Sequence, residues 1–378
     1  MALKPLDYVN LGWIWVRSFL PTYRRWQRGI DQSGISVFYG FDQTPVPGDK
    51  AAGGIIKIQD LESLFPNHPF GANVLYLISS ALPYFAVRMA RMAQRAGAAV
   101  VLNQNGVAYP GWFGKGWKSH NRPMRQLFQI ADHVLYQSRF CKFSADKFLG
   151  KPKGSCEILY NPVDTRIFLP PDNKRKAHKG PRLLIAGSHL SYYRPRVAFD
   201  VLRYVLQKYP EARLVIAGRF KWEDDEERAR QRLKDDIARL GITNSVDLRG
   251  AYSQIEAVDL FQKSDLLLHV KYNDPCPRLV LEAMACGLPV VYSATGGVPE
   301  LVGRNSGIGV PGRLDWEREH PPDPKLMAEA TLRVLENREK FSTAARARAV
   351  EKFDVAPWLR RHAEIFKRFR RKGKLQNS

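Results

Sequence analysis

The sequence predicts an α/β protein in which parallel sheets are covered by helices on both faces, and two observations lead to this fold class. Short apolar runs alternate with helix-length segments along most of the 378 residues, as is typical of parallel sheets. The runs RLLIAGS (182–188) and RLVIAGR (213–219) are near copies, offset by about 30 residues, which is the length of one strand–helix–strand unit. At roughly 150 residues per domain, the length suits two domains.

The first half of the chain contains a series of candidate strands and two clear helices. The strands are predicted at 35–40, 73–79, 98–104, 133–138 and 156–161. The helices are predicted at 88–97 and 139–150, and each is closed by a glycine. We therefore expect a doubly wound domain over residues 1–172.

A change in composition separates this domain from a second one. Residues 169–181 (LPPDNKRKAHKGP) are rich in Pro, Lys and Arg and are predicted to be a linker. Further strands are predicted at 182–188, 213–219, 245–250, 266–270 and 289–293. These predict a second doubly wound domain over 181–353. The segment from 353 onward is predicted to be an amphipathic helix that ends in a basic run.

The charge balance and the cysteines indicate partners and compartment. The formal net charge is +22, which favours an anionic ligand, an anionic membrane surface or nucleic acid. The four cysteines lie far apart without a C-x-x-C pair, so we expect reduced thiols, a cytoplasmic protein and no zinc site. The N-terminus does not resemble a signal peptide, and no apolar stretch is long enough to span a bilayer.

Two basic segments predict peripheral attachment to the inner face of a membrane. One is the C-terminal run of Lys367, Arg368, Arg370, Arg371, Lys372 and Lys374. The other is the aromatic and arginine-containing segment 13–26. Basic residues near an anionic surface each contribute about 1 kcal/mol of attraction. A solvated helix end is the alternative interpretation of the C-terminal run.

Three loops of the second domain are candidates for ligand binding, because open parallel sheets bind ligands at the carboxyl ends of their strands. Gly187 permits a tight turn, after which Arg194 can reach a diphosphate. A helix that begins near Pro277 directs its N-terminal amides toward the same crevice. Gly296 and Gly297 precede a short helix and let the backbone approach a ligand.

Each of these signals also has a purely structural interpretation. A glycine after a strand is commonly only a turn, and Asp274 and Glu282 can be solvated charges. The chain has neither a G-x-G-x-x-G segment after a first strand nor a G-x-x-x-x-G-K-[ST] segment, which disfavours nicotinamide-binding and P-loop enzymes. The spacing by itself predicts only an anionic small molecule in an α/β crevice.

A longer composite motif resembles a known family. Residues 273–303 read NDPCPRLVLEAMACGLPVVYSATGGVPELVG and resemble the donor-binding segment of family 4 glycosyltransferases. The matching positions are the acidic residue Asp274, then Glu282, the run 283–289 and the G-G-x-x-E of 296–300. Weaker similarity to the same family is found at 51–61, a glycine-rich loop, and at 131–140, 158–168 and 353–369.

The resemblance implies a GT-B architecture, in which two Rossmann-like domains face each other across a cleft and the final helix, 354–372, packs back onto the first. It implies retaining transfer of a sugar from a nucleotide-diphosphate-sugar, which is a substrate, with no cofactor and no essential metal. The implied acceptor is a saccharide or a lipid-linked molecule in cell-surface polysaccharide or glycolipid biosynthesis. The sugar, the nucleotide base and the acceptor stay open.

The family pattern also implies roles for individual residues. Glu282 would hydrogen-bond the donor ribose, Asp274 would lie beside the donor sugar, and Arg194 would stabilise the departing diphosphate; these three form the predicted catalytic set. The predicted donor-binding residues are Gly53, Gly54, Gly187, Ser188, His189, Arg219, Cys276, Pro277, Arg278, Gly296 and Gly297. Asn103 and Asn105 are expected on the acceptor side.

The chain departs from the family pattern at several positions. Ser188 stands where an arginine is usual and Arg194 where a lysine is usual, so one phosphate-binding cation is missing. We hypothesise that His189 or Arg219 compensates. Asp274 replaces the usual glutamate, and the residues 103–106 lack the usual histidine. An unusual subgroup or an inactive relative both fit these departures.

Other function classes stay open at this stage. A GT-B enzyme of another class, an epimerase or a phosphorylase, is the first alternative. A basic nucleic-acid-binding protein is the second, although the chain lacks a recognisable nucleic-acid-binding motif. Cys276 and Cys286 are interpreted as packing residues rather than nucleophiles, and His178 and His269 likewise as packing residues.

Overall fold

The computed structural model describes residues 24–44, 53–172 and 179–370. Most of the predicted aromatic segment 13–26, the end of the basic C-terminal run from residue 371, and His178 lie outside the described residues. None of the helices formed by the described residues is long and apolar enough to cross a bilayer.

The first sheet has five parallel strands whose spatial order follows the sequence. They are β1 (Val37–Phe38), β2 (Val74–Ile78), β3 (Ala99–Gln104), β4 (His133–Tyr136) and β5 (Ser155–Ile158). Side chains alternate between two faces, as strand geometry requires. Leu75 and Leu77 belong to one apolar cluster, whereas Val74, Tyr76 and Ile78 belong to another.

Helices cover both faces of this sheet. The first cluster is completed by α4 (Ala86–Arg95), α6 (Trp117–Phe128) and α7 (Arg139–Phe148). The second is completed by α3 (Gly53–Glu62) and by the last helix, α15 (Val355–Phe369). The segment 51–61, which the family resemblance suggested as a glycine-rich loop, is therefore helical from Gly53 onward, because Ile58 and Leu61 are three residues apart and both are buried.

The second sheet has six parallel strands in the order β11-β10-β9-β6-β7-β8. They are β6 (Arg182–Ala186), β7 (Arg213–Ala217), β8 (Val246–Leu248), β9 (Leu266–His269), β10 (Val290–Ser293) and β11 (Gly307–Val310). The strand order reverses between β6 and β9. In doubly wound sheets ligands bind at this switch point, outside the carboxyl ends of the strands.

The helices around the second sheet follow the same alternation. They are α8 (Tyr193–Lys208), α9 (Glu226–Arg239), α10 (Gln254–Gln262), α11 (Arg278–Ala285), α12 (Val298–Val302), α13 (Pro324–Glu336) and α14 (Arg338–Phe353). The two parallel sheets with their helices confirm the predicted α/β class. All strands that the sequence predicts are present, and β11 was not predicted because two of its four residues are glycines, which are depleted in strands.

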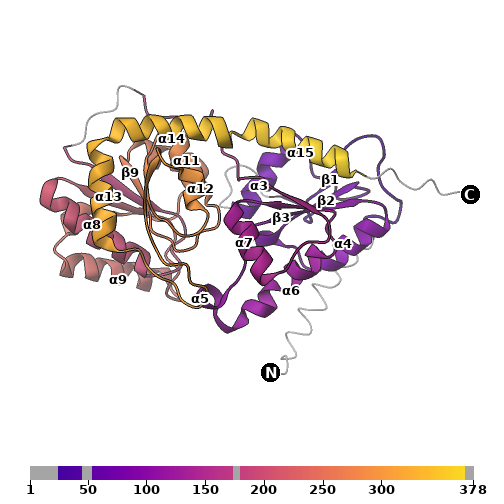
Figure 1. The fold of residues 1–378 in the computed structure, drawn as a ribbon, viewed down its shortest axis with the longest axis horizontal. Coiled ribbons are helices and arrows are strands. Elements are labelled where there is room, and N and C mark those ends of the chain that lie inside the picture. The colour runs from indigo at the N-terminus through magenta and orange to yellow at the C-terminus, as the bar shows by residue number, and fades with distance from the viewer. Residues whose placement is uncertain (1–23, 45–52, 173–178, 371–378) are drawn as a thin grey trace, which may run out of the picture.

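The last two helices span both halves of the molecule (Figure 1). In the view of Figure 1, α14 lies over the second half and α15 over the first. The Tyr76 hydroxyl in β2 donates to His362 Nε2 in α15 at 3.0 Å, and Arg361 forms an ion pair with Glu157 in β5 at 2.8 Å. These contacts attach the end of the chain to the first sheet.

A glutamate from the second half caps a helix of the first. The carboxylate of Glu300 in α12 accepts hydrogen bonds from the backbone N–H groups of Arg139 (2.8 Å) and Phe140 (2.9 Å) and from the Tyr160 hydroxyl (2.9 Å). Arg139 and Phe140 form the first turn of α7, where orphan N–H groups and the helix dipole favour an anion. Glu300 therefore holds the two halves together beside the cleft.

We expect Glu300→Ala to lower the free energy of unfolding by about 2 kcal/mol, because hydrogen bonds to a charged group are worth about 1.5–3 kcal/mol and the α7 amides would lose their partner. Urea unfolding followed by circular dichroism measures this. Glu351→Ala, in which the removed side chain is exposed and paired only with its neighbour Lys352, is the control and should change the value by less than about 0.5 kcal/mol. Equal losses in the two variants would contradict the capping role.

Candidate active site

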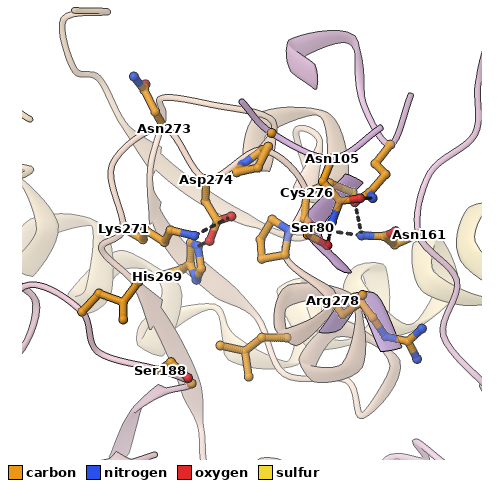
Figure 2. A pocket seen from close by; sticks show the side chains of 18 of the residues that line it. Ser80, Asn105, Asn161, Ser188, His269, Lys271, Asn273, Asp274, Cys276 and Arg278 are labelled. Atoms are coloured by element: carbon orange, nitrogen blue, oxygen red, sulfur yellow. Dashed lines mark hydrogen bonds and ion pairs between the residues drawn. The ribbon is translucent and has the colours of Figure 1, made fainter. Parts of the chain in front are cut away.

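A cavity of about 750 Å³ lies between the two halves. Its second-domain wall is formed by the loops after β6 and β9, the two strands at the switch point, and by α11. Its first-domain wall includes residues of α3 and of the segment after β3. Figure 2 shows side chains from both walls. The sequence-predicted residues that line the cavity are Gly54, Asn105, Gly187, Ser188, His189, Arg194, Arg219, Asp274, Cys276, Pro277, Arg278 and Glu282.

Arg194 is a buried cation with unused donors. The residue is 6% exposed, and its Nη1 donates to the Ser188 carbonyl at 2.9 Å. Its Nε and Nη2 have no hydrogen-bond partner in the protein. Gly187 turns the chain with a φ of 102°, a conformation that favours glycine. The loop therefore presents a guanidinium whose remaining N–H groups require an external acceptor.

His189 does not replace the missing cation near neutral pH. It is buried, and its Nε2 donates to the Ala217 carbonyl at 3.1 Å. Burial lowers the pKa of His189 to about 4, so the ring is neutral near pH 7. Of the two residues hypothesised to compensate for Ser188, only Arg219, which also lines the cavity, carries a positive charge there.

Asp274 lies in the loop after β9 with two basic partners. His269 Nε2 donates to Oδ2 at 3.1 Å, and Lys271 Nζ lies 3.1 Å from Oδ1. Burial by itself raises the pKa of the Asp274 carboxyl, but the Lys271 ammonium and the His269 hydrogen bond outweigh it and hold the pKa well below 3.8. Asp274 is therefore ionised, and His269, interpreted from the sequence as a packing residue, is its hydrogen-bond donor.

Fewer backbone donors are available before α11 than the sequence interpretation assumed. Pro275 and Pro277 have no N–H group, so only the amides of Cys276 and Arg278 can donate in this segment. Pro277 is the residue before the first helical position rather than the first position itself. Pro277 thus contributes shape to the wall and no hydrogen-bond donor.

The side chain of Arg278 faces the first domain. It forms an ion pair with Asp60 in α3, and its Nε lies 3.6 Å from Glu282 Oε1. Burial raises the pKa of the Glu282 carboxyl, and the nearby Arg278 charge opposes that rise. Arg278 therefore links the two walls and lies beside Glu282, while its Nε has no hydrogen-bond partner in the protein.

Three of the predicted glycines and Asn103 do not line the cavity. A Cβ at Gly296 or Gly297 would overlap the backbone of 274–275, so these two glycines let the Asp274 loop pack closely. Gly53 is the first residue of α3. Asn103 is 1% exposed, and its Oδ1 accepts hydrogen bonds beneath the wall from Lys57 (2.9 Å) and Gln137 (2.8 Å).

Two features of the site were missed by the sequence interpretation. Lys57 is buried at the first-domain wall of the cavity, although lysines in helices are usually exposed. An aromatic group closes one end of the cavity, where the Tyr109 and Trp316 rings meet edge to face with centroids 5.0 Å apart. The Gly111 amide donates to the Trp316 carbonyl at 2.8 Å. The only available signal was the density of aromatic residues in 109–117.

The fold is shared with solved enzymes. HepE (Alr3699) of Anabaena, solved in complex with UDP, superimposes with a TM-score of 0.62 over 79% of each chain at 20% identity. Sucrose-phosphate synthase from Thermosynechococcus elongatus superimposes with a TM-score of 0.65 over 79% of this chain and 74% of that one at 16% identity. The chain has the GT-B fold, with the cavity between two Rossmann-like halves.

The sequence comparison gives the family. Residues 171–349 match the family described as glycosyl transferases group 1. The chain thus matches this family over residues 171–349, as the resemblance of residues 273–303 predicted. It is 33% identical over 117 residues to a D-inositol 3-phosphate glycosyltransferase of Streptomyces bingchenggensis, covering 29% of this chain and 26% of that one. The enzyme of the same name from Mycobacterium leprae (strain Br4923) is 30% identical over 150 residues, 39% and 34% of the two chains. The matches thus span about a quarter to a third of these relatives.

Proposed function

We propose that this chain is a retaining glycosyltransferase that transfers a sugar from a UDP-sugar to a saccharide or lipid-linked acceptor. The observation that carries the proposal is the buried Arg194, whose Nε and Nη2 lack partners in a cavity that also contains Asp274 and Glu282. The family match over residues 171–349 supports the reaction class. The UDP bound in the HepE structure supports uracil as the base.

The proposed mechanism follows from the positions of the charged groups. When the bond between the sugar and the diphosphate breaks, negative charge grows on the leaving oxygens. Arg194, Arg219 and the amides at the start of α11 would stabilise that charge more in the transition state than in the ground state. The Glu282 carboxylate would accept hydrogen bonds from the ribose hydroxyls. Asp274 would lie beside the sugar, where its negative charge opposes the positive charge that develops at the anomeric carbon.

The acceptor and the place of action are part of the proposal. A lipid-linked or saccharide acceptor of cell-surface polysaccharide or glycolipid synthesis fits the formal charge of +22, because a basic protein is attracted to the anionic inner face of a membrane. Sedimentation with anionic vesicles at rising salt tests this attachment. Binding that does not weaken with salt would contradict it.

The donor site is tested by titrating the purified protein with UDP, GDP, ADP and dTDP in a thermal-unfolding assay. A ligand present at about 100 times its dissociation constant stabilises by about 2.7 kcal/mol, so we expect UDP to raise Tm by several degrees. Glu282→Gln should remove most of that shift, because the amide cannot accept hydrogen bonds as a carboxylate does.

The matched control is Glu329→Gln, which changes an exposed glutamate of α13. This variant should keep the full UDP shift. The proposal fails if no nucleotide stabilises the wild type, or if Glu282→Gln and Glu329→Gln respond equally to UDP.

A further inference from the structure

Lys57 is a buried cation without a counter-charge in contact. The residue is 1% exposed and lies at the first-domain wall of the cavity. Its ammonium donates to the side-chain oxygens of Asn103 at 2.9 Å and Asn105 at 3.2 Å, which are neutral amides. Within the described part of the chain, no carboxylate lies at ion-pairing distance from it, and the nearby Asp60 is paired with Arg278. A buried charge is costly unless it is paired.

Two of the surrounding amides also donate within this group. Gln137 Nε2 donates to the same two oxygens that Lys57 uses. The Asn161 amide donates to Gln137 Oε1 at 2.9 Å and to the Cys276 carbonyl at 2.7 Å. Since an ammonium has three N–H donors and two are used, one donor of Lys57 is left. Its natural partner is an anion, and the cavity is the place from which an anion can arrive.

This group lies apart from the cation that faces the donor diphosphate. In Figure 2, Asn105, Asn161 and Cys276 form one group to the right of Asp274, and Ser188, whose carbonyl accepts from Arg194, lies apart from that group at the lower left. Lys57 therefore belongs to the part of the cavity where the transferred sugar and the acceptor would meet, not to the part beside β6.

We propose that Lys57 is a specificity-determining residue that pairs with an anionic group, a carboxylate or a phosphate, on a sugar bound in the cavity. The inference rests on the proposed function. The anionic group can belong to the transferred sugar or to the acceptor, and both present the same chemistry to Lys57.

The proposed pairing makes the affinity for a charged sugar depend on pH. Burial lowers the pKa of Lys57 to about 7, so the free protein loses this charge as the pH rises above 7. The titratable groups that face it are Asp60, Cys141, Cys276, Arg278 and His362. Burial raises the pKa of the Cys141 thiol to about 12 and lowers that of His362 to about 4, and the pKa values of Cys276 and Arg278 are also raised. A change in binding between pH 6 and 9 is therefore attributed to Lys57, whose pKa of about 7 lies within this range.

The test is calorimetric titration of the full chain between pH 6 and 9. One arm compares UDP-glucuronate with UDP-glucose, and the other compares glucuronate with glucose on protein saturated with UDP. The glucuronate carboxylate stays ionised over this range, because carboxyl groups titrate near pH 4. At pH 6 we expect the charged sugar to bind about tenfold or more tightly in one arm. That advantage should fall by up to tenfold per pH unit above 7.

Lys57→Met removes the charge while keeping the length of the side chain, and should abolish the advantage while UDP affinity stays unchanged. Lys142→Met, at a half-exposed lysine of α7 paired with Asp146, is the control and should keep it. If Lys57→Met does not fold, the calorimetric titrations of the wild type between pH 6 and 9 are sufficient to test the inference. The inference is overturned if charged and neutral sugars bind with equal affinity in both arms. It is also overturned if the tighter binding of the charged sugar does not change with pH, or if it persists in Lys57→Met. Failure of UDP itself to bind the wild type overturns the proposed function, and this inference with it.

Discussion

Arg194→Met is expected to lower kcat/KM for the UDP-sugar by about 100- to 1000-fold, the usual cost of removing one donor from a preorganised anion site. The expectation follows from the Nε and Nη2 of Arg194, which have no partner in the protein although the residue is only 6% exposed. Since His189 is neutral near pH 7, Arg219 is the one of the two hypothesised substitutes that carries a charge in the cavity. Methionine keeps most of the volume of the arginine side chain, so the decrease in kcat/KM measures the loss of its charge and hydrogen bonds.

The measurement is steady-state transfer with saturating acceptor, together with UDP affinity by calorimetry. Arg196→Met is the matched control on the same helix, because Arg196 lies 3.5 Å from Asp200 and is partly exposed. It should leave both quantities within about twofold of the wild type. If Arg194→Met also changes them by less than threefold, Arg194 does not bind the diphosphate.

The fold was predictable because its signals are local. The whole of β2 and residues 183–186 of β6 are continuous apolar runs, which are typical of strands covered on both faces. β11 was missed, because its pairing with β10 rather than its own composition makes it a strand. The start of α3 was hidden for a related reason. Its two glycines look like a loop, yet a Cβ at Gly54 would lie 2.7 Å from the Ser80 hydroxyl, so the glycine permits close packing.

The site was predictable where a motif fixes the spacing and not where distant segments meet. Asp274 and Glu282 are eight residues apart, and the structure brings both to one cavity with Arg194. Pro275 and Pro277 leave only two backbone N–H groups before α11, and this can be seen in the sequence only when each N–H group is counted. The sequence does not reveal that Lys57 and Asn105, which are far apart along the chain, meet at 3.2 Å. Such contacts depend on how α3 packs on the sheet.

Asp274→Asn is expected to lower kcat by about 100- to 1000-fold while UDP affinity changes by less than about threefold. Asparagine is nearly the same size but carries no charge, and it would leave the Lys271 ammonium, 3.1 Å from the present carboxylate, without its counter-ion. UDP lacks the transferred sugar, so its binding should not depend on a carboxylate that lies beside that sugar. Single-turnover transfer and calorimetry with UDP separate the two effects.

The pH dependence of stability gives this prediction a second readout. The folded-state pKa of Asp274 is held well below 3.8, so the carboxylate stabilises the fold at pH values above 3.8, and this contribution is lost as the pH falls toward the folded-state pKa. The difference in free energy of unfolding between wild type and Asp274→Asn should therefore shrink between pH 5 and 3. Asp259→Asn, which breaks a half-exposed pair with Lys263, is the control. It should leave kcat unchanged, and its free energy of unfolding should stay close to that of the wild type at each pH. A loss of UDP affinity as large as the loss of kcat would place Asp274 at the nucleotide instead of the sugar.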